Sequence, residues 1–149
     1  MQIDSVVFGK IEIDETRVVR LTEPMPGFPK LSSFVVLDPD PESPFKWFQS
    51  LEQSNICFLI ADPRSFFPEY TVELPASRLP DLELAEGGEA AVAVVLTVPQ
   101  DPSKTTANLL APLVFNGSKG IARQVILEGS GYSVRAPIAG PGHLALEVA

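Results

Sequence analysis

The chain has 149 residues, a formal net charge of −8 and a sequence pI of about 4.6. This length fits one domain with its own hydrophobic core, so no disulfide framework or structural metal is needed for stability. Because an acidic protein repels phosphate backbones, the charge argues against direct binding of nucleic acid and favours basic partners.

The compartment is indicated by the cysteine content and by the apolar segments. Cys57 is the only cysteine and lies in an apolar run, where we expect a buried thiol in a reducing compartment. The N-terminal residues lack the basic leader and the long apolar core of a secretory signal. The longest apolar run, residues 90–98, is too short to span a bilayer as a helix. We therefore expect a cytoplasmic protein without membrane contact.

The first third of the chain reads as short strands. Fifteen prolines and ten glycines interrupt the sequence so often that few segments are long enough for a helix. We expect a first hairpin from residues 1–8 and 10–14 around Gly9. Further strands are expected at residues 17–21, 34–37, 44–51 and 56–61.

The middle of the chain mixes turns with strands. Asp62 followed by Pro63 predicts a single helical turn, because aspartate caps a helix and proline suits its first position. The apolar alternation over residues 70–74 predicts a half-buried strand. Residues 75–84 are the best helical segment, but Pro80 limits them to a turn or two. The valine-rich residues 90–98 predict a central strand that is buried on both faces.

Residues 104–127 contain the clearest local signal, KTTANLLAPLVFNGSKGIARQVIL. Two apolar runs meet at residues 116–120, where Asn and Gly permit a tight reversal, so we expect a strand, a turn and a strand. We expect Thr106, Asn108 and Gln124 mainly to satisfy backbone groups, and Arg123 to pair with a carboxylate.

The end of the chain completes the predicted domain. Residues 132–135 can form a last short strand. We expect residues 1–138 to form one all-β, mostly antiparallel domain, a small β-barrel with one or two short helical turns. Residues 139–149 are expected to be a flexible C-terminal tail.

Residues for catalysis or metal binding are scarce. His143 is the only histidine and lies in the predicted tail, which leaves no Ser/His/Asp or Cys/His arrangement. With Cys57 it makes only two nitrogen or sulfur donors, too few for a structural zinc site. We expect a protein that is not an enzyme and has no cofactor. A carboxylate-dependent hydrolase stays open, and it would require two buried acids in one cleft.

Two segments are candidates for recognition. Phe66, Phe67 and Tyr70 cluster beside a proline, where their rings can cap the core or form an apolar docking surface. Residues 69–101 carry seven acids and one arginine, a net charge of −6, whereas residues 104–135 have a net charge of +3. A solvated face that maintains solubility is the simpler explanation of the acidic segment.

Six short sequence pieces occur in the order in which they occur in a known family. They are residues 8–13 (FGKIEI), 25–28 (MPGF), 48–51 (FQSL), 58–63 with 66–70 (FLIADP, FFPEY), 104–112 (KTTANLLAP) and 124–127 (QVIL). Over residues 1–138 the chain resembles the flagellar assembly factor FliW family. Residues 75–84 and the tail after Ile138 contain none of these six pieces. The resemblance therefore predicts no contacts for these two segments.

The resemblance implies a cytoplasmic, non-enzymatic, β-barrel-like protein that binds flagellin and the RNA-binding translational regulator CsrA. In that scheme the free protein sequesters CsrA and relieves repression of flagellin translation. Accumulated flagellin then captures the protein and restores repression. These partners are what the family resemblance implies for this chain.

The resemblance and the charge pattern together give candidate binding residues. We expect Glu69, Glu83, Glu86 and Glu89 to attract the basic regulator, because they belong to the acidic segment. We expect Phe66, Phe67 and Asn108 to belong to a docking surface for a helical segment of flagellin. The alternative is a small β-barrel that binds an apolar metabolite in a cavity lined by phenylalanines.

Overall fold

The structure is a computed structural model that describes residues 1–73, 76–84 and 90–138. Its strands are β1 (Gln2–Ser5), β2 (Gly9–Glu12), β3 (Val18–Leu21), β4 (Ser33–Leu37), β5 (Phe45–Ser50), β6 (Cys57–Ala61), β7 (Ala91–Thr97), β8 (Thr106–Ala107), β9 (Leu113–Asn116), β10 (Ile121–Gln124) and β11 (Ala136–Pro137). The predicted all-β class is confirmed. Helical structure in the described residues consists of five 3-10 turns, rather than one or two: η1 (Glu15–Arg17), η2 (Pro63–Ser65), η3 (Ala76–Arg78), η4 (Pro80–Leu82) and η5 (Pro102–Lys104).

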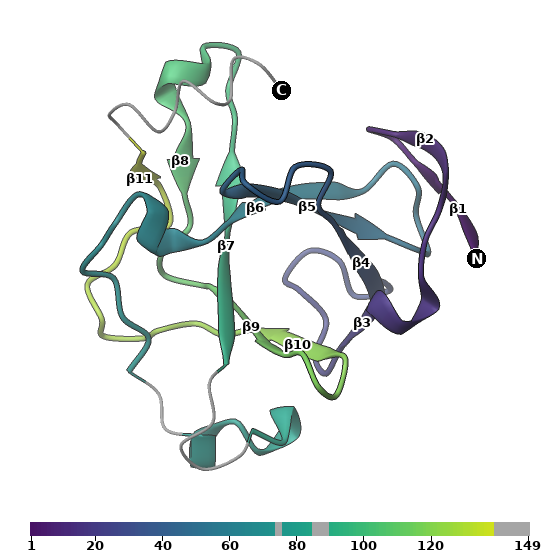
Figure 1. Cartoon of the computed structure of the whole chain (residues 1–149). Helices are drawn as coiled ribbons and strands as arrows, with labels where there is room; N and C mark the ends of the chain where they lie inside the picture. The colour runs from purple at the N-terminus through teal and green to yellow at the C-terminus, as the bar shows by residue number, and fades with distance from the viewer. Residues whose placement is uncertain (74–75, 85–89, 139–149) are drawn as a thin grey trace.

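Seven strands close into a barrel in the order β3-β4-β5-β6-β7-β9-β10. The ring closes because β7 pairs with β6 along one edge and with β9 along the other, while β10 pairs with β3 (Figure 1). All of these pairings are antiparallel except that of β10 with β3, which is parallel. Strand β8 pairs with the last two residues of β7, Leu96 and Thr97, and β11 pairs with β8.

The N-terminal hairpin lies beside the barrel as a sheet of its own (Figure 1). Its turn comprises residues 6–8, and Gly9 begins β2 with a φ of 72° instead of lying in the turn as expected. The hairpin is fastened to the barrel by a hydrogen bond from Val6 N to Ser54 O at 2.9 Å. Phe8 and Trp47 add an edge contact with ring centres 6.2 Å apart.

The barrel interior is filled by one of two hydrophobic clusters. Phe34 and Phe48 are fully buried there, and their rings stack with centres 4.3 Å apart. Ile60 joins them from β6, the neighbour of β5, and Leu113 from β9. Close packing of such rings makes truncation costly, roughly 3–5 kcal/mol for Phe to Ala.

The second and larger cluster lies against the outer face of the barrel. Val94 and Leu96 of β7 belong to it, whereas Ala93 and Val95 pack with the interior cluster. The expected burial of this strand on both faces is therefore confirmed only in part: Val94 and Leu96 are buried, whereas Ala93 and Val95 on the other face are half-buried. The two end residues of the strand are exposed. The outer cluster is completed by residues from the segments that follow β6, β8 and β10, including Tyr70, Leu79, Leu82, Leu109 and Leu127.

The predicted hairpin at residues 116–120 is confirmed as β9 and β10, with Ile121 opposite Asn116. At the turn, Gly120 has a φ of 64°, and a Cβ there would lie 3.3 Å from the Val18 carbonyl, so both the dihedral and the space favour glycine. Arg123 forms the expected ion pair, with its Nη1 3.0 Å from Asp81 Oδ1. Gln124 donates to the Ala111 carbonyl at 3.0 Å, a backbone contact as expected.

Two predicted strands are not found. Residues 70–73 form no strand, and Leu74 lies outside the described residues. Residues 132–135 also form no strand, and pairing occurs instead at β11. The predicted tail, residues 139–149, lies outside the described residues. Cys57 is half-buried rather than buried, and the apolar surroundings still raise the pKa of its thiol to about 11.

Candidate functional site

The aromatic turn, residues 66–70, begins where a capped 3-10 turn ends strand β6. Asp62 Oδ1 accepts a hydrogen bond from Arg64 N at 2.9 Å, and Pro63 occupies the first helical position, as the sequence predicts. Phe67 N then donates to the Pro63 carbonyl at 2.8 Å. These bonds fix the direction in which the two phenylalanines leave the barrel.

Both phenylalanines of the turn are half-buried and pack against the outer core. The Phe66 ring lies 5.5 Å from the ring of Phe45 in β5. Each ring therefore caps the core with one side and leaves part of its surface accessible. Glu69 follows them and is exposed.

Tyr70 anchors the turn in the core. Its side chain is 3% exposed, and its hydroxyl donates to the Leu109 carbonyl at 2.7 Å. Its ring lies 4.6 Å from that of Tyr132. Burial, and secondarily the neighbouring Tyr132, raise the pKa of Tyr70 well above its ordinary value. The phenol is therefore neutral and acts as a hydrogen-bond donor at any physiological pH.

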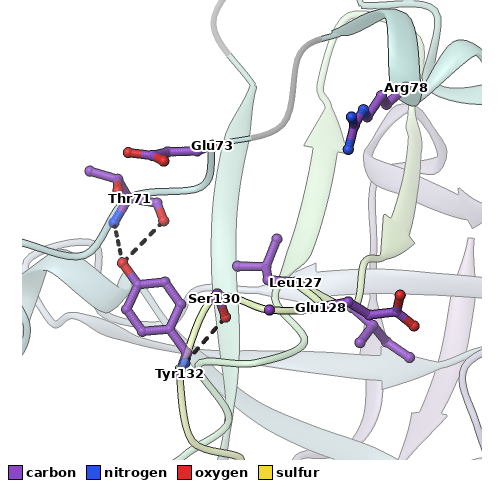
Figure 2. A pocket seen from close by; sticks show the side chains of 9 residues that line it. Thr71, Glu73, Arg78, Leu127, Glu128, Ser130 and Tyr132 are labelled. Carbon is purple, nitrogen blue, oxygen red and sulfur yellow. Dashed lines mark hydrogen bonds between the residues drawn. The ribbon is translucent and has the colours of Figure 1, made fainter.

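A hollow of about 440 Å³ lies next to the aromatic turn (Figure 2). We call it the turn pocket; it is lined by Thr71, Glu73, Arg78, residues 126–130 and Tyr132. Two hydrogen bonds between Tyr132 and Thr71 join two sides of the pocket (Figure 2). The Tyr132 hydroxyl accepts from Thr71 N at 3.2 Å and donates to Thr71 O at 3.3 Å. Ile126, which also lines it, is 54% exposed, a large apolar side chain open to solvent.

Asn108 does not line the turn pocket, and its polar groups bond to the backbone. Its Oδ1 accepts from Ala111 N at 3.1 Å, and its own N donates to the Val95 carbonyl at 2.9 Å. The carbonyl oxygen of the next residue, Leu109, accepts the hydrogen bond from the Tyr70 hydroxyl. Asn108 is half-buried, so it shapes the loop on which the aromatic turn rests.

The acidic candidates divide into two groups. Glu69 belongs to the aromatic turn, whereas Glu83 follows η4 and is exposed, with a φ of 52°. The η4 end is tied to the barrel by Asn116, which donates through Nδ2 to the Leu82 carbonyl at 2.8 Å. Glu86 and Glu89 lie outside the described residues. The structure thus places Glu83 on a different element from the aromatic turn.

One acid of the segment has a structural partner. Asp81 accepts from Thr22 Oγ1 and lies 3.0 Å from Arg123 Nη1. Partial burial opposes ionisation of Asp81, but the bonds from Thr22 and Arg123 outweigh it and lower the pKa of the carboxyl below its ordinary value. The Arg123 Nε also lies 3.4 Å from Glu23 Oε2, an ion-pair distance without a hydrogen bond. Asp81 therefore holds η4 to β10 and is less available to a partner.

Comparison with known proteins gives the family. The model of the family described as FliW protein matches residues 2–138. The chain belongs to the FliW family. A protein of Desulfitobacterium hafniense named flagellar assembly factor FliW is 39% identical over 135 residues, which cover 91% of this chain and 89% of that one. One of Geotalea uraniireducens with the same name is 36% identical over 92% of this chain and 83% of its own.

A solved structure agrees with the family assignment. A crystal structure described as that of the flagellar assembly factor FliW superposes with a TM-score of 0.85 and 34% identity. The alignment covers 94% of this chain and 98% of that one. The FliW family and the barrel architecture are thus both shown, and membership supports a role in flagellar assembly.

Residues 1–73, 76–84 and 90–138 contain no group of three or more His, Cys, Asp or Glu side chains placed to hold a metal ion. No helix in these ranges has the length and apolarity needed to cross a membrane.

Sequence reasoning did not find several residues of the turn pocket, notably Thr71, Ile126 and Tyr132. Ile126 stands in the apolar run VIL, a pattern that predicts a buried residue. In the structure it follows the end of β10, and its side chain is exposed. Tyr132 is 61 residues from Thr71 in the chain, and no local pattern signals that contact.

Proposed function

We propose that this chain acts in flagellar assembly as a cytoplasmic, non-enzymatic binding protein that switches between flagellin and CsrA. When free, it sequesters CsrA and relieves repression of flagellin translation; when flagellin accumulates, it is captured and repression returns. The observation that carries the proposal is the match of the FliW family model to residues 2–138, together with the same barrel in the solved FliW structure. The partner switch itself is the part that experiments must test.

The aromatic turn and the turn pocket are the proposed flagellin surface. Phe66 and Phe67 offer accessible apolar area, and Ile126 adds an exposed apolar side chain at the pocket. An amphipathic helix binds by laying its apolar face on such a surface. Asn108 contributes to this surface indirectly, because its Oδ1 accepts from Ala111 N and so stabilises the loop that contains Leu109. The Leu109 carbonyl in turn accepts the hydrogen bond from the Tyr70 hydroxyl.

Replacing both phenylalanines tests this surface. We expect the Phe66→Ala, Phe67→Ala double variant to bind flagellin at least roughly tenfold more weakly, because buried aromatic anchors commonly carry 2 kcal/mol or more of binding energy. Affinity is measured by isothermal titration calorimetry, and thermal unfolding confirms that the variant is folded.

A matched control replaces another exposed apolar pair. Val6 and Val7, in the turn of the N-terminal hairpin, are 61% and 43% exposed. The Val6→Ala, Val7→Ala variant should bind flagellin as the unmodified chain does. Equal loss of binding in both variants, or full binding by a folded aromatic double variant, would reject the surface.

The acidic segment is the proposed source of attraction for CsrA. Glu69 and Glu83 are exposed, so their charges face solvent, where long-range attraction acts. The net charge of −8 also repels RNA phosphates, which favours a protein surface over nucleic acid as the contact. Glu86 and Glu89 belong to the same proposal on sequence grounds.

A charge-matched pair of variants tests the acidic segment. The triple variant Glu83→Lys, Glu86→Lys, Glu89→Lys should bind CsrA at least about tenfold more weakly than the unmodified chain at low salt. The loss should be smaller at high salt, because salt screens the charges of the unmodified chain and of the variant alike. The control is Asp4→Lys, Glu15→Lys, Glu42→Lys, three exposed acids elsewhere with the same total charge change. If both triples lose the same affinity at every salt concentration, the acidic segment has no special role.

A further inference from the structure

The segment that contains η3 and η4, residues 76–84, belongs to both proposed partner surfaces. Arg78 of η3 lines the turn pocket, which is part of the proposed flagellin surface (Figure 2). Glu83 directly follows η4 and is part of the acidic segment proposed for CsrA. Both side chains are exposed. Because these nine residues carry one member of each surface, we call them the shared segment.

The shared segment is fastened to the barrel at several points. Leu82 is 0% exposed and belongs to the outer cluster. Asp81 Oδ1 lies 3.0 Å from Arg123 Nη1 of β10. Asn116 of β9 donates through Nδ2 to the Leu82 carbonyl at 2.8 Å and to the Glu83 carbonyl at 3.2 Å. These contacts hold the two exposed residues of the segment at a fixed separation on the barrel.

This separation is short compared with the width of a protein interface. Arg78 and Glu83 are five positions apart in the chain, so their Cα atoms lie within about 18 Å of each other even for a fully extended backbone. A protein partner typically covers about 800 Å² of surface, which corresponds to a patch of roughly 16 Å in radius. Two such patches centred on these residues overlap, because their radii sum to about 32 Å.

We propose that flagellin and CsrA both cover the shared segment and exclude each other by direct overlap at this place. This exclusion rests on the proposed partner switch and gives it a location in the fold. It requires no change in the shape of the barrel, because whichever partner is bound occupies residues that the other needs.

Hydrogen exchange of backbone amides, followed by mass spectrometry, tests the overlap on the unmodified chain. Flagellin monomer alone and CsrA alone should each slow exchange at least about fivefold in peptides covering residues 77–84, because either partner restricts opening of the segment. Peptides covering residues 66–71 should be slowed by flagellin only, since the aromatic turn is proposed to contact that partner alone. The turn of the N-terminal hairpin, residues 6–8, should exchange equally fast with and without either partner.

A bulky neutral substitution tests whether the shared segment is needed for binding. Ser77 is exposed and precedes Arg78 in η3. Ser77→Trp should bind flagellin and CsrA at least about tenfold more weakly each, because a large ring inside an interface prevents close packing of the partner. The control Ser54→Trp places the same ring on an exposed residue between β5 and β6 and should leave both affinities unchanged. Thermal unfolding confirms that both variants are folded.

Two results would overturn direct overlap while leaving the partner switch intact. One is slowed exchange in residues 77–84 with only one of the two partners. The other is full binding of either partner by folded Ser77→Trp. Failure of the unmodified chain to bind flagellin or CsrA would instead reject the partner switch itself, and the overlap with it.

Discussion

The aromatic turn and the acidic segment are both proposed to meet partners, but the protein holds them in different ways. The aromatic turn is part of the outer core, with Tyr70 at 3% exposure and bonded to Leu109. Glu83, in contrast, is an exposed side chain at the end of a short 3-10 turn. Substitutions in the aromatic turn should therefore affect folding and binding together, while those at Glu83 should affect binding alone.

The largest effect is expected at Tyr70. Tyr70→Ala removes a buried ring and should lower the free energy of unfolding by roughly 3–5 kcal/mol. Tyr70→Phe keeps the ring but leaves the Leu109 carbonyl without its donor, at a cost of about 1–2 kcal/mol. Urea unfolding followed by tryptophan fluorescence measures both. Losses below about 0.5 kcal/mol in both variants would contradict the view that the aromatic turn is part of the core.

Asp81 gives an intermediate effect, because it belongs to the acidic segment in sequence but has a structural partner. Asp81→Asn should lower the free energy of unfolding by about 1 kcal/mol near neutral pH, a typical value for a partly exposed pair with a hydrogen bond. Its side chain is 31% exposed, which limits the effect through solvent screening.

The pH dependence of this variant follows from the lowered pKa of Asp81. A carboxyl with a depressed pKa in the folded state stabilises the protein fully above its unfolded pKa, about 3.9, and loses this contribution as pH falls through the folded value. The stability difference between the unmodified chain and Asp81→Asn should thus be constant at about pH 6 and shrink below about pH 4. A difference that grows on acidification would contradict the ion-pair assignment.

The smallest effect on stability is expected at Glu83. Glu83→Lys should change the free energy of unfolding by less than about 0.5 kcal/mol, because the side chain is exposed and forms no ion pair among the described residues. The triple charge reversal that includes Glu83→Lys should still weaken CsrA binding at low salt. Thermal unfolding and salt-dependent calorimetry together separate the two properties. A loss above about 1 kcal/mol would make Glu83 a structural residue like Asp81.

Local signals in the sequence predicted local structure well. The Asp62-Pro63 cap, the reversal at residues 116–120 and the strand β7 were all predictable, since each depends on neighbours in the chain. The pairing of Arg123 with a carboxylate was also predictable from the excess of acids, although its particular partner, Asp81, was not.

Contacts between distant segments could not be predicted. The alternation over residues 70–74 reads as a strand, but Tyr70 and Thr71 are bonded to Leu109 and Tyr132, which hold residues 70–73 outside any sheet. The parallel pairing of β10 with β3 closes the barrel and joins segments about 100 residues apart, for which no turn sequence exists.

The partner switch is tested most directly by competition between flagellin and CsrA for this protein. The preformed complex with CsrA is mixed with increasing flagellin monomer and separated by size-exclusion chromatography. We predict that flagellin takes the protein into a new complex and that CsrA elutes free, in proportion to the flagellin added. Elution of all three in one complex, or retention of CsrA at saturating flagellin, would contradict the proposed switch.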